Sequence, residues 1–155
     1  MIEKVAVHVK DRVTLDEIIN RFKSNPRFDE VGAIISFTGV VKGVSRDGEK
    51  LDKIDFEMDR EATERRLREI ANEFEKRKHV LEVSIHMNAG ELYPGEILSH
   101  IALATTCDGP EVGEMFKALH EILETIKRTA GIRLKEKSEK GWYYTKPKDK
   151  TKTFD

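Results

Sequence analysis

The 155-residue sequence contains a single cysteine, Cys107, and its five histidines stand singly. One cysteine cannot form an internal disulfide, and no Cys/His group has the spacing of a zinc module. His86 and His100 fall on predicted strands, so we expect surface or hydrogen-bonded structural residues there, and no bound metal. No apolar stretch approaches the roughly 20 residues of a membrane span, and no signal peptide is recognisable. These absences predict a cytoplasmic protein.

Charged residues make up 37% of the chain, and the two signs are unevenly distributed. The formal net charge is −1, yet residues 127–155 contain ten Lys/Arg against four Asp/Glu. Such a basic segment can bind nucleic acid, attract an anionic small molecule or simply be solvated. Composition alone leaves these three interpretations open.

The first elements of the chain are a predicted strand and a predicted helix. Valines alternate with polar residues over 5–9, which is typical of a strand with one buried face. Thr14 and Glu17 have the spacing of a capping box, ahead of apolar residues at helical spacing. We therefore expect a helix over residues 15–23.

Two hairpins are predicted further along the chain. The apolar run 32–42 and the alternating residues 53–58 flank an Asp-Gly turn at 47–48, which predicts the first hairpin. Residues 81–87 alternate, and the more apolar run 97–106 follows them after a turn. The second hairpin is expected to pair these two segments.

Two longer helices are predicted, one after each hairpin. Asp59 can cap the first, whose inward stripe is Ala62, Leu67, Ile70, Ala71 and Phe74. The second has the strongest helical periodicity in the chain, at Val112, Met115, Phe116, Leu119, Ile122, Leu123 and Ile126. Gly131 is placed to end it.

The order of these elements predicts an α+β domain with a largely antiparallel sheet and helices packed on one side. A chain of this length suits one compact domain, which we expect over residues 1–146. Residues 147–155 have little apolar content and are expected to form a basic, flexible tail. Open sheet edges can pair with another chain, so an oligomer is plausible.

Familiar catalytic signatures are missing, including GxSxG, HExxH, the P-loop and GxGxxG after a strand. What remains is a cluster of cations formed by Lys127 and Arg128 in a last helical turn, followed by Arg133, Lys135 and Lys137. A lysine crowded by cations loses its proton more easily and can become a nucleophile or base. Composition favours the alternative, in which these cations complement the helix dipole and are solvated.

Several segments resemble the large, catalytic subunit of molybdopterin synthase, over roughly residues 30–145. GAIISFTGVVKG at 32–43 is similar to the Gly-Ala-hydrophobic-Phe-Thr-Gly-x-Val-Arg segment of that family, and GELYPGE at 90–96 is similar to its Gly-Glu-Leu-Trp-Pro-Gly-Asp turn. The helix at 115–131, MFKALHEILETIKRTAG, is similar to the family helix that ends in an essential lysine. KGWYY at 140–144 resembles the Trp-containing strand that follows.

The resemblance implies an enzyme of molybdenum cofactor biosynthesis that works by sulfur transfer. Its substrate would be cyclic pyranopterin monophosphate (precursor Z), converted to the molybdopterin dithiolene without a further cofactor. The sulfur donor would be a ubiquitin-like small subunit with a C-terminal Gly-Gly thiocarboxylate. The resemblance also implies the α/β-hammerhead fold and a homodimer at the centre of a heterotetramer. No nucleic-acid or membrane partner is expected.

The resemblance also assigns site residues. Lys127 corresponds to the essential helix lysine, and Lys135 to a second lysine shortly after it, if one extra residue is allowed between them. We expect Lys127 to act as general acid/base and Lys135 to orient an anion or stabilise an oxyanion. Lys42 and Arg128, together with Lys135, are expected to bind the anionic substrate.

Two departures keep other functions open. Residues 105–110 lack the His-Arg pair of the family, and Lys42 stands where the family has an arginine. A non-catalytic homologue that binds a ubiquitin-like partner is one alternative, and a nucleic-acid binder with a basic segment at 127–155 is another. Trp142, Tyr143 and Tyr144 could stack on bases, although an aromatic strand packed in the core is the favoured interpretation.

Overall fold

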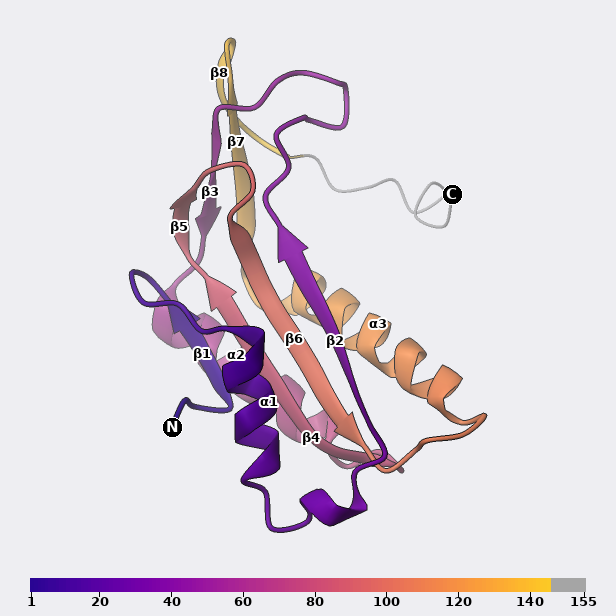
Figure 1. The fold of residues 1–155 in the computed structure, drawn as a ribbon. Coiled ribbons are helices and arrows are strands. Elements are labelled where there is room, and N and C mark those ends of the chain that lie inside the picture. The colour runs from indigo at the N-terminus through magenta and orange to yellow at the C-terminus, as the bar shows by residue number, and fades with distance from the viewer. Residues whose placement is uncertain (146–155) are drawn as a thin grey trace.

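The computed structural model describes residues 1–145, which form two four-stranded sheets and three α-helices (Figure 1). The first sheet contains, in spatial order, β1 (Val5–His8), β4 (Val80–Asn88), β6 (Ile97–Thr105) and β2 (Ala33–Val40). β1 is parallel to β4, and the other neighbours are antiparallel. The α+β class, the first strand and the β4–β6 hairpin are thus confirmed.

The second sheet is antiparallel throughout and lies beyond one end of the first (Figure 1). Its strands, in spatial order, are β5 (Gly90–Leu92), β3 (Lys53–Glu57), β7 (Arg133–Ser138) and β8 (Gly141–Tyr144). The predicted hairpin of 32–42 with 53–58 is wrong. Residues 47–48 do form a turn, and Val44 bridges to Lys50. The two strands nevertheless enter different sheets, because β2 pairs with β6 over eight residues.

The helices cover both faces of the first sheet, whereas the sequence predicted helices on one side. α2 (Arg60–Phe74) and α3 (Val112–Thr129) cover one face, and α1 (Leu15–Lys23) covers the other (Figure 1). The central strands are apolar on both faces, so each face needs a cover. Ala102 and Ala104 lie under Ile18 and Phe22 of α1, and their small side chains let the helix approach closely.

Helix ends follow the local signals of the sequence. Thr14 and Glu17 form the predicted capping box, and Asp59 accepts a hydrogen bond from the Ala62 backbone N–H at 3.0 Å. The inward stripes differ at two positions. Ala62 is exposed while the neighbouring Thr63 is buried and donates its hydroxyl proton to the Ala130 carbonyl, and Phe116 of α3 is 58% exposed.

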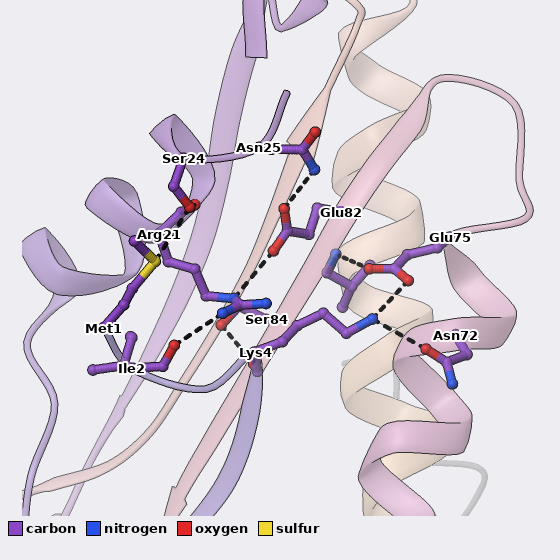
Figure 2. Close-up of polar contacts among 11 residues, drawn as sticks. Met1, Ile2, Lys4, Arg21, Ser24, Asn25, Asn72, Glu75, Glu82 and Ser84 are labelled. Atoms are coloured by element: carbon purple, nitrogen blue, oxygen red, sulfur yellow. Dashed lines mark hydrogen bonds and ion pairs between the residues drawn. The ribbon is translucent and has the colours of Figure 1, made fainter. Parts of the chain in front are cut away.

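A polar network ties the N-terminal elements to the first sheet (Figure 2). Lys4, just before β1, forms an ion pair of 2.8 Å with Glu75 at the end of α2. Arg21 of α1 lies 3.2 Å from the Glu82 carboxylate on β4, which also accepts a hydrogen bond of 2.8 Å from Asn25. The first contact holds the end of α2 to the segment before β1, and the others hold α1 and the residues after it to β4.

Within residues 1–145, no helix combines the length and the apolar character needed to cross a lipid bilayer. The predicted tail at 147–155 lies outside the described residues, and the single domain expected over 1–146 stays a prediction. The predicted site residues Lys127 and Lys135 lie near the junction of the two sheets. There α3 ends and β7 begins, between Lys127 and Lys135.

Candidate functional site

Lys127 and Arg128 lie exposed in the last turn of α3, where cations complement the negative end of the helix dipole. The helix ends as predicted at Gly131, whose φ of 72° is left-handed. Successive helical residues point about 100° apart. Of the two cations, Arg128 lines a groove between α2 and α3 and Lys127 does not.

The groove between α2 and α3 has a volume of about 550 Å³ and mixed charge. The groove is lined by three arginines and three carboxylates, those of Arg66, Arg77, Arg128, Glu73, Glu121 and Glu124. Arg77 and Glu121 form an ion pair of 2.7 Å across it. Arg128 therefore has compensating carboxylates nearby, and the groove does not offer the uncompensated positive charge expected for an anion site.

Lys135 lies on the outer face of the second sheet, on the strand that follows α3. The strand register places it directly between Asp55 of β3 and Tyr144 of β8. Its ammonium Nζ is 5.4 Å from the ring centre of Tyr144 and 5.5 Å from that of Trp142. Both distances are within the range of a cation–π contact.

The favoured interpretation, in which the aromatic residues of β8 pack in the core, is wrong. Trp142 is 37% exposed and Tyr144 is 41% exposed, and both point to the outer face together with Lys135. Tyr144 donates its hydroxyl proton to Glu57 at 2.8 Å, and the Arg133 guanidinium lies 3.9 Å from the centre of its ring. An edge strand with alternating side chains turns every second residue outward, which explains the exposure.

A cavity of about 550 Å³ lies next to this face, at the junction of the two sheets. It is lined by Val9, Asp55, Phe56, Glu57, Met58, Asp59, Ala89, Gly90, Gly131 and Arg133. Burial, followed by the charges of Glu57 and Glu91, raises the pKa of the Asp55 carboxyl, and Lys135 opposes the shift. Among the described residues, the lining contains one cation, Arg133, and three carboxylates, those of Asp55, Glu57 and Asp59.

Lys42 is exposed and lies just beyond β2. Its charge and that of Arg46 reach Glu136 of β7, where they oppose the rise in the Glu136 carboxyl pKa that burial causes. Glu136 and Lys135 are consecutive strand residues and therefore point to opposite faces of the sheet. The charge of Lys42 thus acts on Glu136, and it is not among the charges that act on Asp55 beside Lys135.

The four predicted site residues are thus distributed over three surroundings. Gly131 and Arg133 contribute to the cavity. Lys127 lies one helical turn before Gly131, and Lys135 lies just after Arg133. Sequence reasoning missed Asp55 and Glu57, because only the pairing of β3 with β7 shows that they lie beside the cations. The alternation of polar and apolar residues in Lys53–Glu57 predicted the strand, but it did not indicate which strand would pair with it.

The structure contains a buried histidine chain toward the end of the first sheet that faces the second sheet. His8 lies 2.8 Å from Asp11 and 2.9 Å from His86, and His100 lies 2.8 Å from the Thr38 hydroxyl. His86 and His100 are therefore hydrogen-bonded structural residues rather than surface ones. Among residues 1–145, no group of three or more His, Cys, Asp or Glu side chains has the arrangement of a metal site.

The fold is similar to that of solved structures with molybdopterin-related names. A molybdopterin synthase from Staphylococcus aureus matches with a TM-score of 0.78 and 22% identity, over 95% of this chain and 100% of that one. Molybdopterin cofactor biosynthesis protein E from Burkholderia multivorans matches with a TM-score of 0.70 and 22% identity, over 95% and 94%. A complex of subunits 1 and 2 of the molybdopterin-converting factor from Helicobacter pylori matches at 0.70 and 11%, over 95% and 93%.

At these identities the structural likeness defines the fold class, an α+β protein built like the molybdopterin synthase structures. The sequence goes further, because the model of the MoaE protein family matches residues 8–129, well over half of the chain. The chain belongs to the MoaE family, that of the molybdopterin synthase large subunit. No curated protein matches it significantly.

Proposed function

We propose that this chain is the catalytic large subunit of a molybdopterin synthase. In this proposal it transfers sulfur from a thiocarboxylated small subunit to cyclic pyranopterin monophosphate and forms the molybdopterin dithiolene. The observation that best supports the proposal, beside the family match, is the placement of Lys127, Arg133 and Lys135 around the end of α3. Arg133 lines the cavity at the junction of the two sheets, and Lys127 and Lys135 precede and follow its lining residues Gly131 and Arg133 along the chain.

The charges of the two reactants explain why cations are needed. The substrate phosphate and the thiocarboxylate are both anions, and they repel each other as they approach. Lysine ammonium groups at the site would attract both and offset this repulsion. We propose that Lys127 acts as general acid/base at the pterin side-chain carbons, and that Lys135 stabilises the anion or a developing oxyanion. Lys42 and Arg128, expected from the sequence to bind the substrate, lie apart from Lys135 and are kept in the proposal as secondary contacts.

The proposed partner is a ubiquitin-like small subunit whose Gly-Gly thiocarboxylate enters the site. The Helicobacter pylori structure with the same fold is a complex of two molybdopterin-converting factor subunits, which supports a partner of this kind. A homodimer at the centre of a heterotetramer is part of the proposal. The open edges of both sheets are compatible with such assembly. A cytoplasmic location, predicted from the sequence, also belongs to it.

The proposal is tested by reconstituting the reaction. The chain is mixed with a thiocarboxylated small subunit and cyclic pyranopterin monophosphate, and the dithiolene product is followed by mass spectrometry. We expect wild type to form product, Lys127→Ala to lose about 100-fold or more, and Lys135→Ala to lose about 100-fold. Lys117→Ala is the matched control, because Lys117 is an exposed lysine of the same helix paired with Glu114 at 3.3 Å.

A second function is favoured by the loss of the His-Arg pair at residues 105–110 and by the separate position of Lys42. A diverged homologue would bind the ubiquitin-like partner without turnover. Association of the two subunits with no product from wild type would support this alternative and contradict the synthase. Salt-sensitive binding to DNA or RNA without subunit association would contradict both and favour the nucleic-acid binder.

A further inference from the structure

The ammonium of Lys135 has two kinds of neighbour, a carboxylate on one side and aromatic rings on the other. Asp55 is its direct partner on β3, and Tyr144 its direct partner on β8. Within residues 1–145, Lys53 forms an ion pair with Glu91 on this same face, whereas Lys135 forms none with Asp55. The ammonium lies instead over Trp142 and Tyr144, at 5.5 and 5.4 Å from the ring centres.

The rings are themselves held in place. The Tyr144 hydroxyl donates to Glu57 at 2.8 Å, and the Arg133 guanidinium covers the ring at 3.9 Å. Trp142 has a second cation near it, since Lys53 Nζ is 5.7 Å from its ring centre. Both rings are more than a third exposed, so burial in a core does not account for their position on β8.

The choice of neighbour changes what the ammonium can do. A carboxylate in contact would compensate the lysine charge, and an approaching anion would then meet a nearly neutral pair. An aromatic ring attracts a cation through its quadrupole and has no net charge of its own. A lysine held by rings therefore keeps its charge for an anionic reactant.

We infer that Trp142 and Tyr144 are positioning residues for Lys135, which hold its ammonium away from Asp55 so that it faces an anionic group of a reactant. The anionic group is the thiocarboxylate or the phosphate. The inference rests on the proposed function where it concerns turnover, but the position of the ammonium can be measured independently of it.

The position of the ammonium is tested by NMR on the full chain with reductively ¹³C-methylated lysines. The Lys135 signal is identified by its loss in Lys135→Arg. A methyl group over two ring faces is shifted upfield, and we expect the shift to diminish in Trp142→Ala and in Tyr144→Ala. Phe116→Ala, which removes an exposed aromatic residue from α3, is the matched control and leaves the signal in place. An unshifted Lys135 signal in wild type overturns the inference.

The effect on turnover is tested by a double-mutant cycle in the reconstituted reaction. We expect Trp142→Ala and Tyr144→Ala each to lower kcat/KM by about two- to fivefold, the value of an exposed cation–π contact. Because the freed lysine would pair with Asp55, each loss should be at least halved when measured in an Asp55→Asn background. Trp142→Phe and Tyr144→Phe keep a ring and should retain most activity, and circular dichroism identifies any variant that fails to fold.

The outcomes distinguish this inference from the proposed function. Equal losses with and without Asp55→Asn would show that the rings act only through folding, and would overturn the positioning role. A higher KM for the small subunit assigns the thiocarboxylate as the group that Lys135 meets, and a higher KM for the pterin assigns the phosphate. Absence of turnover in wild type contradicts the proposed function, while the NMR measurement still decides where the ammonium lies.

Discussion

His8 and His86 share a buried hydrogen bond of 2.9 Å between Nε2 of the first ring and Nδ1 of the second. The Asp11 carboxylate can only accept, so the His8 Nδ1 that faces it at 2.8 Å holds the proton. In the neutral chain, His8 Nε2 then accepts from His86 Nδ1–H. This leaves His86 Nε2 as a buried acceptor with no hydrogen-bond partner in the described residues.

This histidine chain predicts that the protein loses stability as the pH falls below neutral. Burial, and then the neighbouring His8 and His100, lower the pKa of His86 to about 4 from an ordinary 6.5. The Glu3 backbone opposes the lowering of the His86 pKa and Arg21 adds to it, and burial also lowers the pKa of His100. Between pH 6.5 and 4 the unfolded chain binds more protons than the folded one. The free energy of unfolding therefore decreases as the pH decreases, by about 3 kcal/mol for His86.

The measurement is urea denaturation between pH 7.5 and 4.5. His86→Phe removes the titrating ring and keeps an aromatic side chain of similar shape. The free energy of unfolding of this variant should therefore change less over this interval than that of wild type. His79→Phe is a poor substitute as a control, because His79 has a positive φ; His120→Phe, on α3, is preferred. An equal pH dependence in wild type and His86→Phe would contradict the prediction.

Glu75 is expected to be the most sensitive position of the network in Figure 2. Its carboxylate accepts from Lys4 at 2.8 Å and from the Val83 backbone N–H at 2.8 Å. Glu75→Ala leaves both donors without this partner and should lower the free energy of unfolding by about 1 to 3 kcal/mol. Glu69→Ala removes an exposed partner of Arg66 at 3.3 Å and should change it by less than about 0.5 kcal/mol. Equal effects in urea denaturation would count against the network.

Substitution by alanine at Gly131 and at Gly113, at the two ends of α3, should change the free energy of unfolding in opposite directions. Gly131 has a φ of 72°, so an alanine there is strained although the space is open, and Gly131→Ala should destabilise by about 1 to 2 kcal/mol. Gly113 lies in the first turn with open space, and Gly113→Ala should stabilise by up to about 1 kcal/mol. Thermal unfolding of both variants provides the check. Stabilisation by Gly131→Ala would mean that the helix does not end there.

Among the site residues, local sequence determined the positions along the chain but not the neighbours in space. The long apolar stripe of α3 and Gly131 placed Lys127 in a last helical turn, and the structure has it there. The pairing of Lys135 with Asp55 joins residues 80 positions apart, and no local pattern specifies it. The predicted orientation of Trp142 was wrong, because alternation of side chains shows that a strand has two faces but not which face the rest of the protein buries.

The sequence by itself determined the helices, their capping residues, the β4–β6 hairpin and membership of the MoaE family, because capping, periodicity and motif spacing act over a few residues. Tertiary structure decided the rest. It separated β2 from β3, placed α1 on the second face of the first sheet, and turned the aromatic residues of β8 outward beside Lys135. These outcomes depend on which distant segments bury each other's apolar surface, a competition across the whole chain.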